Sequence, residues 1–326
     1  MSRKIAVWLL ATILPATFSL AEAQQPADVP WIGYLNGQSL SSISARIEAF
    51  RQGLRELGYV EGKNIFIEWG SAEGKLDRQR ELAAELVRLK VAVIVTGGPG
   101  STRAVNAATA TIPIVMAQDT DPVANGFVAS LARPGGNITG LSTLAPELSG
   151  KRLELLKEIL PKLSRVAVLG TLTQPGNGQA LREVEVAARA FGVKLQYLDI
   201  LDPKDIETAF RAATKARAEA VLALPSPVLN SYRTQVAELA IKSRLPAIWS
   251  REYVEAGGLM SYGVNVLDLD RRAATYVDKI LKGRTPAELP VEQPMKFEFI
   301  INLKAAKQIG LTIPPNVLVR ANKVIR

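Results

Sequence analysis

The feature that most constrains this chain is an alternation between short β-branched runs and longer amphipathic stretches, which begins at residue 30. Residues 31–35, 64–69 and 91–95 have strand character, and residues 41–57 and 77–89 between them carry apolar positions at helical spacing. Repeated alternation of strands and helices predicts a parallel sheet that helices cover on both faces. The predicted fold class is therefore α/β.

The alternation restarts near residue 148, without a shared motif at a fixed offset. A chain of 326 residues is long enough for two domains of roughly 100–200 residues each. We expect a short helix at residues 126–131, one helix at 229–243 and a strand at 259–264. No Gly/Ser-rich linker separates the halves, and extra elements follow the second half. The chain is thus predicted to form two α/β lobes and to cross between them more than once, as in a hinged clamshell.

Residues 1–23 have the pattern of a signal peptide. Arg3 and Lys4 give a basic start, residues 5–20 are apolar, and Ala21-Glu22-Ala23 fits a signal-peptidase site. A membrane anchor that stays attached is the alternative. The chain has no cysteine, and therefore lacks the residue that carries the lipid of a bacterial lipoprotein. We expect cleavage, export to the periplasm and no lipid anchor.

The chain also contains no histidine. Without histidine and cysteine, Ser-His-Asp triads, histidine bases, thiolate nucleophiles and the usual zinc sites are excluded. The formal net charge is +9, but basic residues alternate with acidic ones along the predicted helices, as in Arg46, Glu48, Arg51, Arg55 and Glu56. We interpret these stretches as solvated helix faces. We expect no catalytic residue, no metal, no cofactor and no nucleic-acid partner.

The loops at the carboxyl ends of the predicted strands are where an open parallel sheet binds its ligand. In this chain those loops carry small, polar, hydrogen-bonding residues, as a small-molecule cleft requires. The candidate ligand-binding residues are Asn36, Gly37, Gly98, Ser101, Thr102, Gln118, Asp121, Thr171, Thr173, Asn177, Ser226, Trp249, Arg251 and Glu252.

The loop VTGGPGSTR at residues 95–103 raises the question of a nucleotide site. No lysine follows Gly100, as a Walker loop needs, and the loop after the first strand lacks the GxGxxG pattern. One interpretation is a tight turn with Ser101 as the helix N-cap. The same turn can also bind a ligand, because the N-terminus of a helix favours an anion, commonly a carboxylate, to which Ser101 or Thr102 can donate.

Four further candidates each have two interpretations. Asp121 is either the partner of a ligand cation or a turn residue before Pro122. Trp249 is either a core tryptophan or a cleft-facing ring that stacks on the solute. Arg251 and Glu252 can bind a carboxylate or an amine, or they can form a salt bridge at the rim.

Several long motifs resemble one family. They are FRQGLRELGYVEGKN at residues 50–64, Asp121-Pro122-Val123, FVASLARPGGNITG at 127–140, GKRLELLK at 150–157 and FEFIINLKAAKQIGLTIPPNVLVRANKVI at 297–325. These motifs resemble the type I periplasmic solute-binding proteins of ABC importers, in the uncharacterised branch related to tryptophan/tyrosine-binding components. The resemblance runs from about residue 30 to the end of the chain.

The resemblance implies two Rossmann-like lobes, each a parallel sheet flanked by helices, joined by three hinge crossovers near residues 141–146, 257–264 and 290–294. The N-terminal lobe would comprise residues 30–143 and 258–289, and the C-terminal lobe residues 144–257 and 290–326. The lobes would close around a solute and present a surface to an inner-membrane ABC permease. We expect the chain to be a monomer.

The predicted function is capture of a small solute that carries a carboxylate, such as an amino acid or an aromatic acid. Gly98 stands where many relatives carry threonine, so one side-chain donor for such a ligand is missing. Two alternatives remain open. One is an exported sensor that serves a chemoreceptor or a sensor kinase, and the other is an exported enzyme that uses the carboxylates of Asp119 and Asp121.

Overall fold

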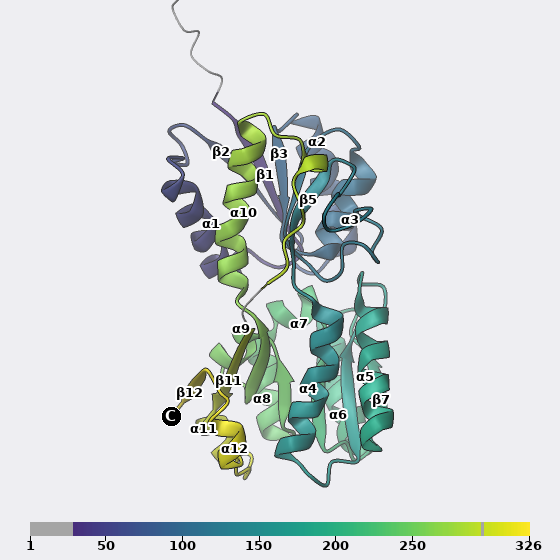
Figure 1. The fold of residues 1–326 in the computed structure, drawn as a ribbon. Coiled ribbons are helices and arrows are strands. Elements are labelled where there is room, and N and C mark those ends of the chain that lie inside the picture. Colours follow the sequence, from purple (N-terminus) through teal and green to yellow (C-terminus); the bar gives the residue numbers. More distant parts are fainter. Residues whose placement is uncertain (1–28, 295–296) are drawn as a thin grey trace, which may run out of the picture.

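The computed structural model describes residues 29–294 and 297–326 and shows two lobes stacked end to end (Figure 1). Each lobe holds one sheet, with five strands in the N-terminal lobe and seven in the C-terminal lobe. The predicted signal peptide, residues 1–23, lies outside the described residues. Within the described ranges, no helix is long and apolar enough to cross a bilayer.

The sheet of the N-terminal lobe is parallel throughout, in the order β2-β1-β3-β4-β5. Helices α1 and α10 cover one face, and α2 and α3 cover the other. Consecutive residues of β1 serve both cores, since Tyr34 packs under α1 and α10 while Leu35 packs under α2. The elements are β1 (Trp31–Asn36), α1 (Ser44–Glu56), β2 (Phe66–Ser71), α2 (Leu76–Arg88), β3 (Val93–Thr96), α3 (Pro99–Ala108), β4 (Ile114–Asp119), β5 (Ile138–Ser142), α10 (Val266–Leu281) and the 3₁₀ turn η1 (Pro286–Glu288).

The sheet of the C-terminal lobe has the order β12-β11-β10-β9-β8-β6-β7 and is parallel except between β10 and β11. Strand β6, which lies between β8 and β7, is apolar on both faces, because Val168 packs under α4 and α5 and Leu169 packs under α6 and α8. The elements are α4 (Ala145–Ile159), β6 (Arg165–Gly170), α5 (Asn177–Phe191), β7 (Lys194–Asp199), α6 (Pro203–Lys215), β8 (Ala220–Ala223), α7 (Pro227–Ser231), α8 (Arg233–Lys242), β9 (Ala247–Trp249), α9 (Arg251–Glu255), β10 (Met260–Val264), β11 (Phe297–Asn302), α11 (Leu303–Gln308), α12 (Pro315–Leu318) and β12 (Lys323–Ile325).

The chain passes between the lobes three times, from β5 to α4, from β10 to α10 and from η1 to β11 (Figure 1). The predicted fold class, two α/β lobes joined by three crossovers, is confirmed. One predicted boundary is wrong, because residues 258–264 were assigned to the N-terminal lobe. Strand β10 pairs with β9 and β11 in the C-terminal sheet, and the chain returns to the N-terminal lobe only at α10.

Two predicted helices also differ from the structure. Residues 126–131 form turns instead of a helix, since Gly126 adopts a positive φ of 74° that interrupts helical geometry. The single helix predicted at residues 229–243 is divided into α7 and α8 at Tyr232. These differences leave the sheet order unchanged, and the α7 segment contributes Pro227 and Asn230 to the space between the lobes.

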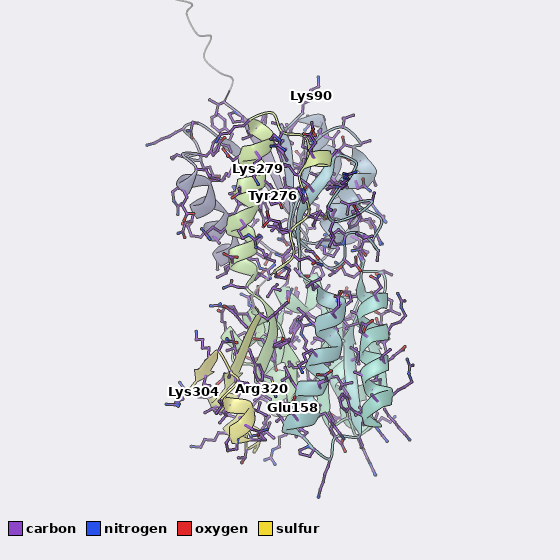
Figure 2. All side chains as sticks on the ribbon, viewed as in Figure 1. Lys90, Glu158, Tyr276, Lys279, Lys304 and Arg320 are labelled. Atoms are coloured by element: carbon purple, nitrogen blue, oxygen red, sulfur yellow. The ribbon has the colours of Figure 1, made fainter. Side chains whose placement is uncertain are left out.

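The C-terminal segment is anchored on the C-terminal lobe. Arg320 donates to Glu158 of α4 at 2.6 Å, and strand β12 extends the sheet beside β11 (Figure 2). In the other lobe the ammonium of Lys279 lies 5.4 Å from the ring centre of Tyr276 on the outer part of α10. Both contacts lie away from the interlobe space, so they stabilise each lobe without fixing the hinge.

Candidate functional site

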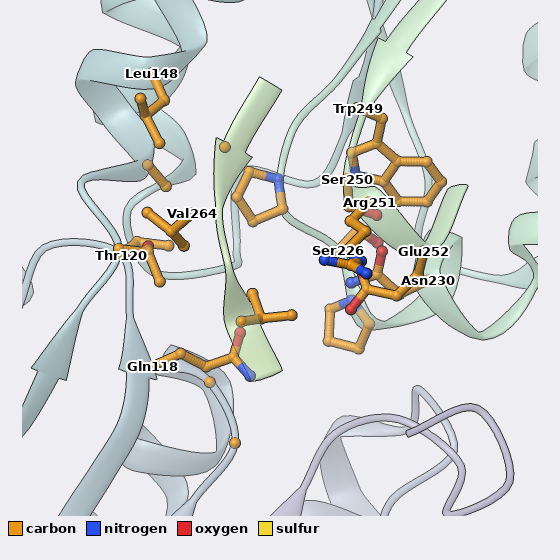
Figure 3. Close-up of a pocket in the computed structure, with 18 of the residues that line it drawn as sticks. Gln118, Thr120, Leu148, Ser226, Asn230, Trp249, Ser250, Arg251, Glu252 and Val264 are labelled. Carbon is orange, nitrogen blue, oxygen red and sulfur yellow. The ribbon is translucent and has the colours of Figure 1, made fainter. Parts of the chain in front are cut away.

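A cavity of about 140 Å³ lies between the lobes, at the carboxyl ends of strands of both sheets (Figure 3). An apolar cavity of about 150 Å³ is large enough for benzene, so this one suits a small solute. The lining includes Gln38, Arg46, Gly97, Gly98, Pro99, Gln118, Asp119, Thr120 and Thr143 from the N-terminal lobe and the first crossover. It also includes Ala145, Leu148, Arg152, Gln174, Pro225, Ser226, Pro227, Asn230, Trp249, Ser250, Arg251, Glu252, Ser261, Gly263, Val264, Val266 and Glu298.

Asp119, the last residue of β4, forms part of the N-terminal wall. Its Oδ1 accepts hydrogen bonds from the Asn125 side chain at 2.8 Å and from the Asp121 backbone N–H at 3.2 Å. Its Oδ2 is buried and has no hydrogen-bond partner in the described part of the chain. Burial raises the pKa of Asp119 to about 7, although the bonds from Asn125 and Asp121 oppose the shift. The carboxyl group is thus poised to accept a donor from within the cavity.

The C-terminal wall is formed by the ends of β8 and β9 and the short helices that follow them. Ser226 caps α7 by accepting from the Leu229 backbone N–H at 3.2 Å. Asn230 lies one turn further along this segment, and its Oδ1 is buried without a partner. Figure 3 shows Ser226, Asn230 and the segment from Trp249 to Glu252 on the same side of the cavity. On the facing side, the buried Nε2 of Gln118 also has no partner.

Trp249 contributes only part of its ring to the cavity. It is 3% exposed, and its ring centre lies 5.7 Å from that of Tyr253 in a core cluster of the C-terminal lobe. Trp249 therefore belongs to the core and also lines the cavity, while stacking of its ring on a solute stays a prediction.

A buried ion pair joins the lobes at one end of the cavity. Arg46 of α1 donates through Nε to Glu252 of α9 at 2.9 Å, and its Nη2 also binds the same carboxylate. Burial alone would lower the pKa of Arg46, but the charges of Glu252 and Asp270 outweigh it, and the net shift is upward. Asp270 in turn accepts from the hydroxyl of Tyr34 at 2.9 Å. The guanidinium is therefore neutralised by the protein itself.

A second buried guanidinium, that of Arg152 on α4, has no such partner. It is 8% exposed and donates through Nε to the backbone carbonyl of Tyr262 at 2.8 Å. Among the described residues it forms no ion pair with a carboxylate. Burial lowers the pKa of Arg152 to about 10, against a weak opposing effect of Tyr262.

The lobes also meet along one rim of the cleft, where two loops touch across the gap. The hydroxyl of Thr120 donates to the Pro175 carbonyl at 3.3 Å, and Gln179 donates to Asp121 at 3.5 Å. Gly176 packs so tightly here that an added Cβ would overlap the Thr120 hydroxyl. The structure thus has a closed cleft.

Of the fourteen residues predicted from the sequence, six line the cavity. They are Gly98, Gln118, Ser226, Trp249, Arg251 and Glu252. Arg251 and Glu252 both form salt bridges, Arg251 with Glu255 and Glu298, and Glu252 with Arg46.

The other eight predicted residues surround the cavity without lining it. Four are buried and bonded within their own lobe: Asn36, Ser101, Thr102 and Asn177. Gly37 packs against Gln79 and Pro227, and Thr171 and Thr173 lie on an outer groove along the lobe seam. Asp121 accepts from the Ala124 N–H in a turn and reaches Gln179 across the rim.

Two functional candidates escaped the sequence analysis. Arg46 was interpreted as part of a solvated helix face. This is wrong, because Arg46 is only 4% exposed and is buried beside Ile47. Arg152 appeared only inside a family motif. A signal for it was available, since it stands among Leu148, Leu155 and Leu156 on the apolar face of α4. A lone arginine on the apolar face of a helix requires a counter-charge, because burial of an unpaired charge is costly.

The comparison with known proteins agrees with this geometry. The family model described as ABC transporter substrate binding protein matches residues 34–325. A tyrosine-binding protein from Clostridioides difficile is 26% identical over 271 residues, which cover 83% of this chain and 78% of that protein. The chain belongs to the ABC transporter substrate-binding protein family.

Solved structures show the same architecture. A conserved domain protein from Vibrio cholerae aligns with a TM-score of 0.85 at 29% identity, over 91% of this chain and 99% of that one. An ABC domain in complex with L-Trp from Streptococcus pneumoniae aligns at 0.84 and 26% identity, with the same coverage. A ligand-free, open substrate-binding protein from Clostridium difficile aligns at 0.63 and 23% identity, again over 91% and 99%.

Proposed function

We propose that this chain is the periplasmic solute-binding component of an ABC importer and that it captures an amino acid or a related small aromatic acid between its lobes. The observation that carries the proposal is the interlobe cavity, whose walls present buried polar atoms without partners among the described residues on Gln118, Asp119, Asn230, Ser250 and Glu252. Buried polar groups are normally hydrogen-bonded, so five such atoms around one cavity indicate a ligand that supplies missing bonds. The proposed activity is binding without chemical turnover.

Hinge closure is the second part of the proposal. The rim contacts of Thr120 with Pro175 and of Asp121 with Gln179 form only when the lobes approach. In addition, the chain aligns better with the L-Trp complex, at 0.84, than with the open ligand-free protein, at 0.63. A ligand that binds the closed form more tightly than the open form shifts the population toward closure. The closed surface would then be recognised by a membrane permease, with the chain acting as a monomer after removal of its signal peptide.

Of the six predicted residues that line the cavity, four are proposed to contact the solute directly: Gly98, Gln118, Ser226 and Trp249. Arg251 and Glu252 are proposed to hold the wall through their salt bridges. The eight others are proposed to support the walls and the rim. On this assignment Asn177 has a positioning role, because its side-chain N–H₂ ties the Thr171 carbonyl to the Pro225 carbonyl at 2.8 and 2.9 Å. These bonds fix the loops after β6 and β8 relative to each other.

The first test is native mass spectrometry of the mature protein, gently purified from the periplasm. We expect a discrete adduct of small mass that is lost on unfolding. Small-angle scattering should then show that the released solute, added back, compacts the protein. An unchanged scattering profile at saturation would contradict capture by closure.

A matched pair of variants tests whether closure is needed for binding. Gly176 and Gly192 both have positive φ, of 82° and 64°, so alanine at either position costs about 1–2 kcal/mol of backbone strain. Only at Gly176 does the new Cβ meet the other lobe, since nothing lies within 4 Å of the Cβ position at Gly192. We expect Gly176→Ala to lower solute affinity at least about tenfold more than Gly192→Ala. Equal affinities in the two variants would show that the rim contact is not part of the binding-competent state.

A further inference from the structure

The cavity is lined by three cations among the described residues, and two of them are neutralised by the protein. Arg46 pairs with Glu252, and Arg251 pairs with Glu255 and Glu298. Arg152 is the exception, because its guanidinium is buried and bound only to a neutral backbone carbonyl. A buried charge without a counter-charge is costly, since the interior solvates it poorly.

The surroundings of Arg152 leave room for an anion. Gly263 lines the cavity beside it, and a Cβ at this glycine would lie 3.3 Å from the Nη2 of Arg152. The absence of that Cβ keeps the guanidinium accessible from the cavity. The planar fork of arginine donates two parallel hydrogen bonds to a carboxylate, a geometry that lysine does not reproduce.

An acid without a counter-charge stands on another wall of the same cavity. Asp119 is 0% exposed, and among the described residues its Oδ2 has no hydrogen-bond partner and no cation pairs with its carboxylate. Its hydrogen bonds come from a neutral amide side chain and a backbone N–H. A ligand ammonium would supply both the missing hydrogen bond and the missing positive charge.

We propose that Arg152 binds the carboxylate and Asp119 the ammonium of a zwitterionic amino acid. This assignment rests on the proposed function, and it deepens that function by naming the two residues that select the ligand. It places the carboxylate on the C-terminal lobe and the ammonium on the N-terminal lobe. A single ligand then neutralises both lone charges only when the cleft is closed, which couples its binding to closure. The helix N-terminus after Gly100 was predicted to be the carboxylate site, and on this assignment the start of α3 is part of the wall instead.

The test begins with isothermal titration of the mature full chain against the twenty L-amino acids. The amino acid that binds best is then compared with its two truncated analogues, the amine without the carboxylate and the acid without the ammonium. We expect each analogue to bind at least about thirtyfold more weakly than the parent. The variants are Arg152→Met, Arg152→Lys and Asp119→Asn, with Arg182→Met, an exposed position on α5, as the control.

Arg152→Met should bind the amino acid at least about thirtyfold more weakly, whereas it should bind the carboxylate-free amine as well as the wild type does. Its ligand-free thermal midpoint should be unchanged or raised, because a lone buried charge has been removed. A residue with only a structural role would lower the midpoint and affect the amine equally. Arg152→Lys, which keeps the charge and loses the fork, should bind with intermediate affinity and serves if the methionine variant fails to fold.

The outcomes separate the two proposals. If the amino acid binds Arg152→Met and Asp119→Asn as tightly as the wild type, the two-anchor assignment is overturned while solute capture stands. If no amino acid binds but another metabolite from a periplasmic extract does, the zwitterion assignment is overturned and capture again stands. If nothing binds and scattering shows no closure, the proposed function fails and the assignment fails with it.

Discussion

The two arginines buried at this cavity, Arg46 and Arg152, have opposite electrostatic surroundings. Arg46 lies between Glu252 of the other lobe and Asp270 of its own, and the pKa of Arg46 is raised despite burial. Arg152 faces a backbone carbonyl and a glycine, and burial lowers its pKa to about 10. Both are on helices that start from the interlobe region, α1 in one lobe and α4 in the other.

The difference shows how one cavity can hold two kinds of buried charge. The pair of Arg46 and Glu252 is complete without a ligand, so it contributes to the approach of the lobes themselves. Arg152 has no counter-charge among the described residues, so it favours the approach of the lobes only when an anion binds to it. On the proposed function, a chain with both features would close readily and would still gain from ligand binding.

The largest effect is expected from breaking the complete pair. Arg46→Met leaves Glu252 buried without a cation, which costs about 3–5 kcal/mol in a buried site. Opening the cleft exposes Glu252 to water, so we expect the variant to favour the open form and to bind solute about a hundredfold more weakly. Scattering of the ligand-free protein and titration calorimetry measure the two changes.

The control for this prediction is the double variant Arg46→Met/Glu252→Met. It removes both charges, and replacing a buried ion pair by apolar residues is often neutral or stabilising. The double variant should therefore recover most of the affinity that the single variant loses. A double variant as weak as the single one would show that Arg46 acts on the ligand directly rather than through Glu252.

A pH titration of solute binding tests the unpaired charges of the cavity through Asp119, the proposed partner of the ligand ammonium. Burial raises the pKa of Asp119 to about 7, so below pH 7 the free protein carries a neutral carboxylic acid there. An ammonium binds the ionised form, so binding releases a proton below pH 7 and the affinity rises as the pH rises, levelling off above 7. We expect about tenfold weaker binding at pH 6 than in the plateau near pH 8.

The charged group that faces Asp119 is Asp121, whose like charge works in the same direction as burial, while Asn125 donates to the ionised form. Asp119→Asn should remove the pH dependence along with most of the affinity. Asp270, whose pKa burial also raises to about 7, is bonded to Tyr34 and is not part of the cavity lining. A slope that persists in Asp119→Asn would assign the titration to Asp270 instead.

The smallest effect concerns Trp249, which lines the cavity and is only 3% exposed. Solute binding should change its fluorescence, and Trp249→Phe should abolish that change while the emission of Trp31 and Trp69 remains. Because the phenylalanine ring keeps the packing against Tyr253, the affinity for the solute should fall by less than about tenfold. A full fluorescence response in Trp249→Phe would place the solute nearer another tryptophan.

Much of the fold could be predicted because it follows from local periodicity. The strand at residues 31–35 and the helix at 77–89 appear as β1 and α2 with shifts of a residue or two. The loops at the strand ends were also located correctly, and six of their residues line the cavity. Strand β10 was placed in the wrong lobe, since a strand of only five residues fits either sheet and only its pairing with β9 and β11 decides.

The sequence by itself determined the alternation of strands and helices, the two lobes and the absence of histidine and cysteine chemistry, because these depend on residue type and near neighbours. Only the tertiary structure decided which charges are neutralised. Arg46 and Glu252 are 206 positions apart, and nothing in the surroundings of either residue in the sequence indicates the other. Arg152 is unpaired for the same reason, since the lack of a counter-charge depends on every element packed around it. Ion pairing acts through space over a few ångströms, whereas periodicity acts along the chain, and this difference separates what the sequence specifies from what the fold decides.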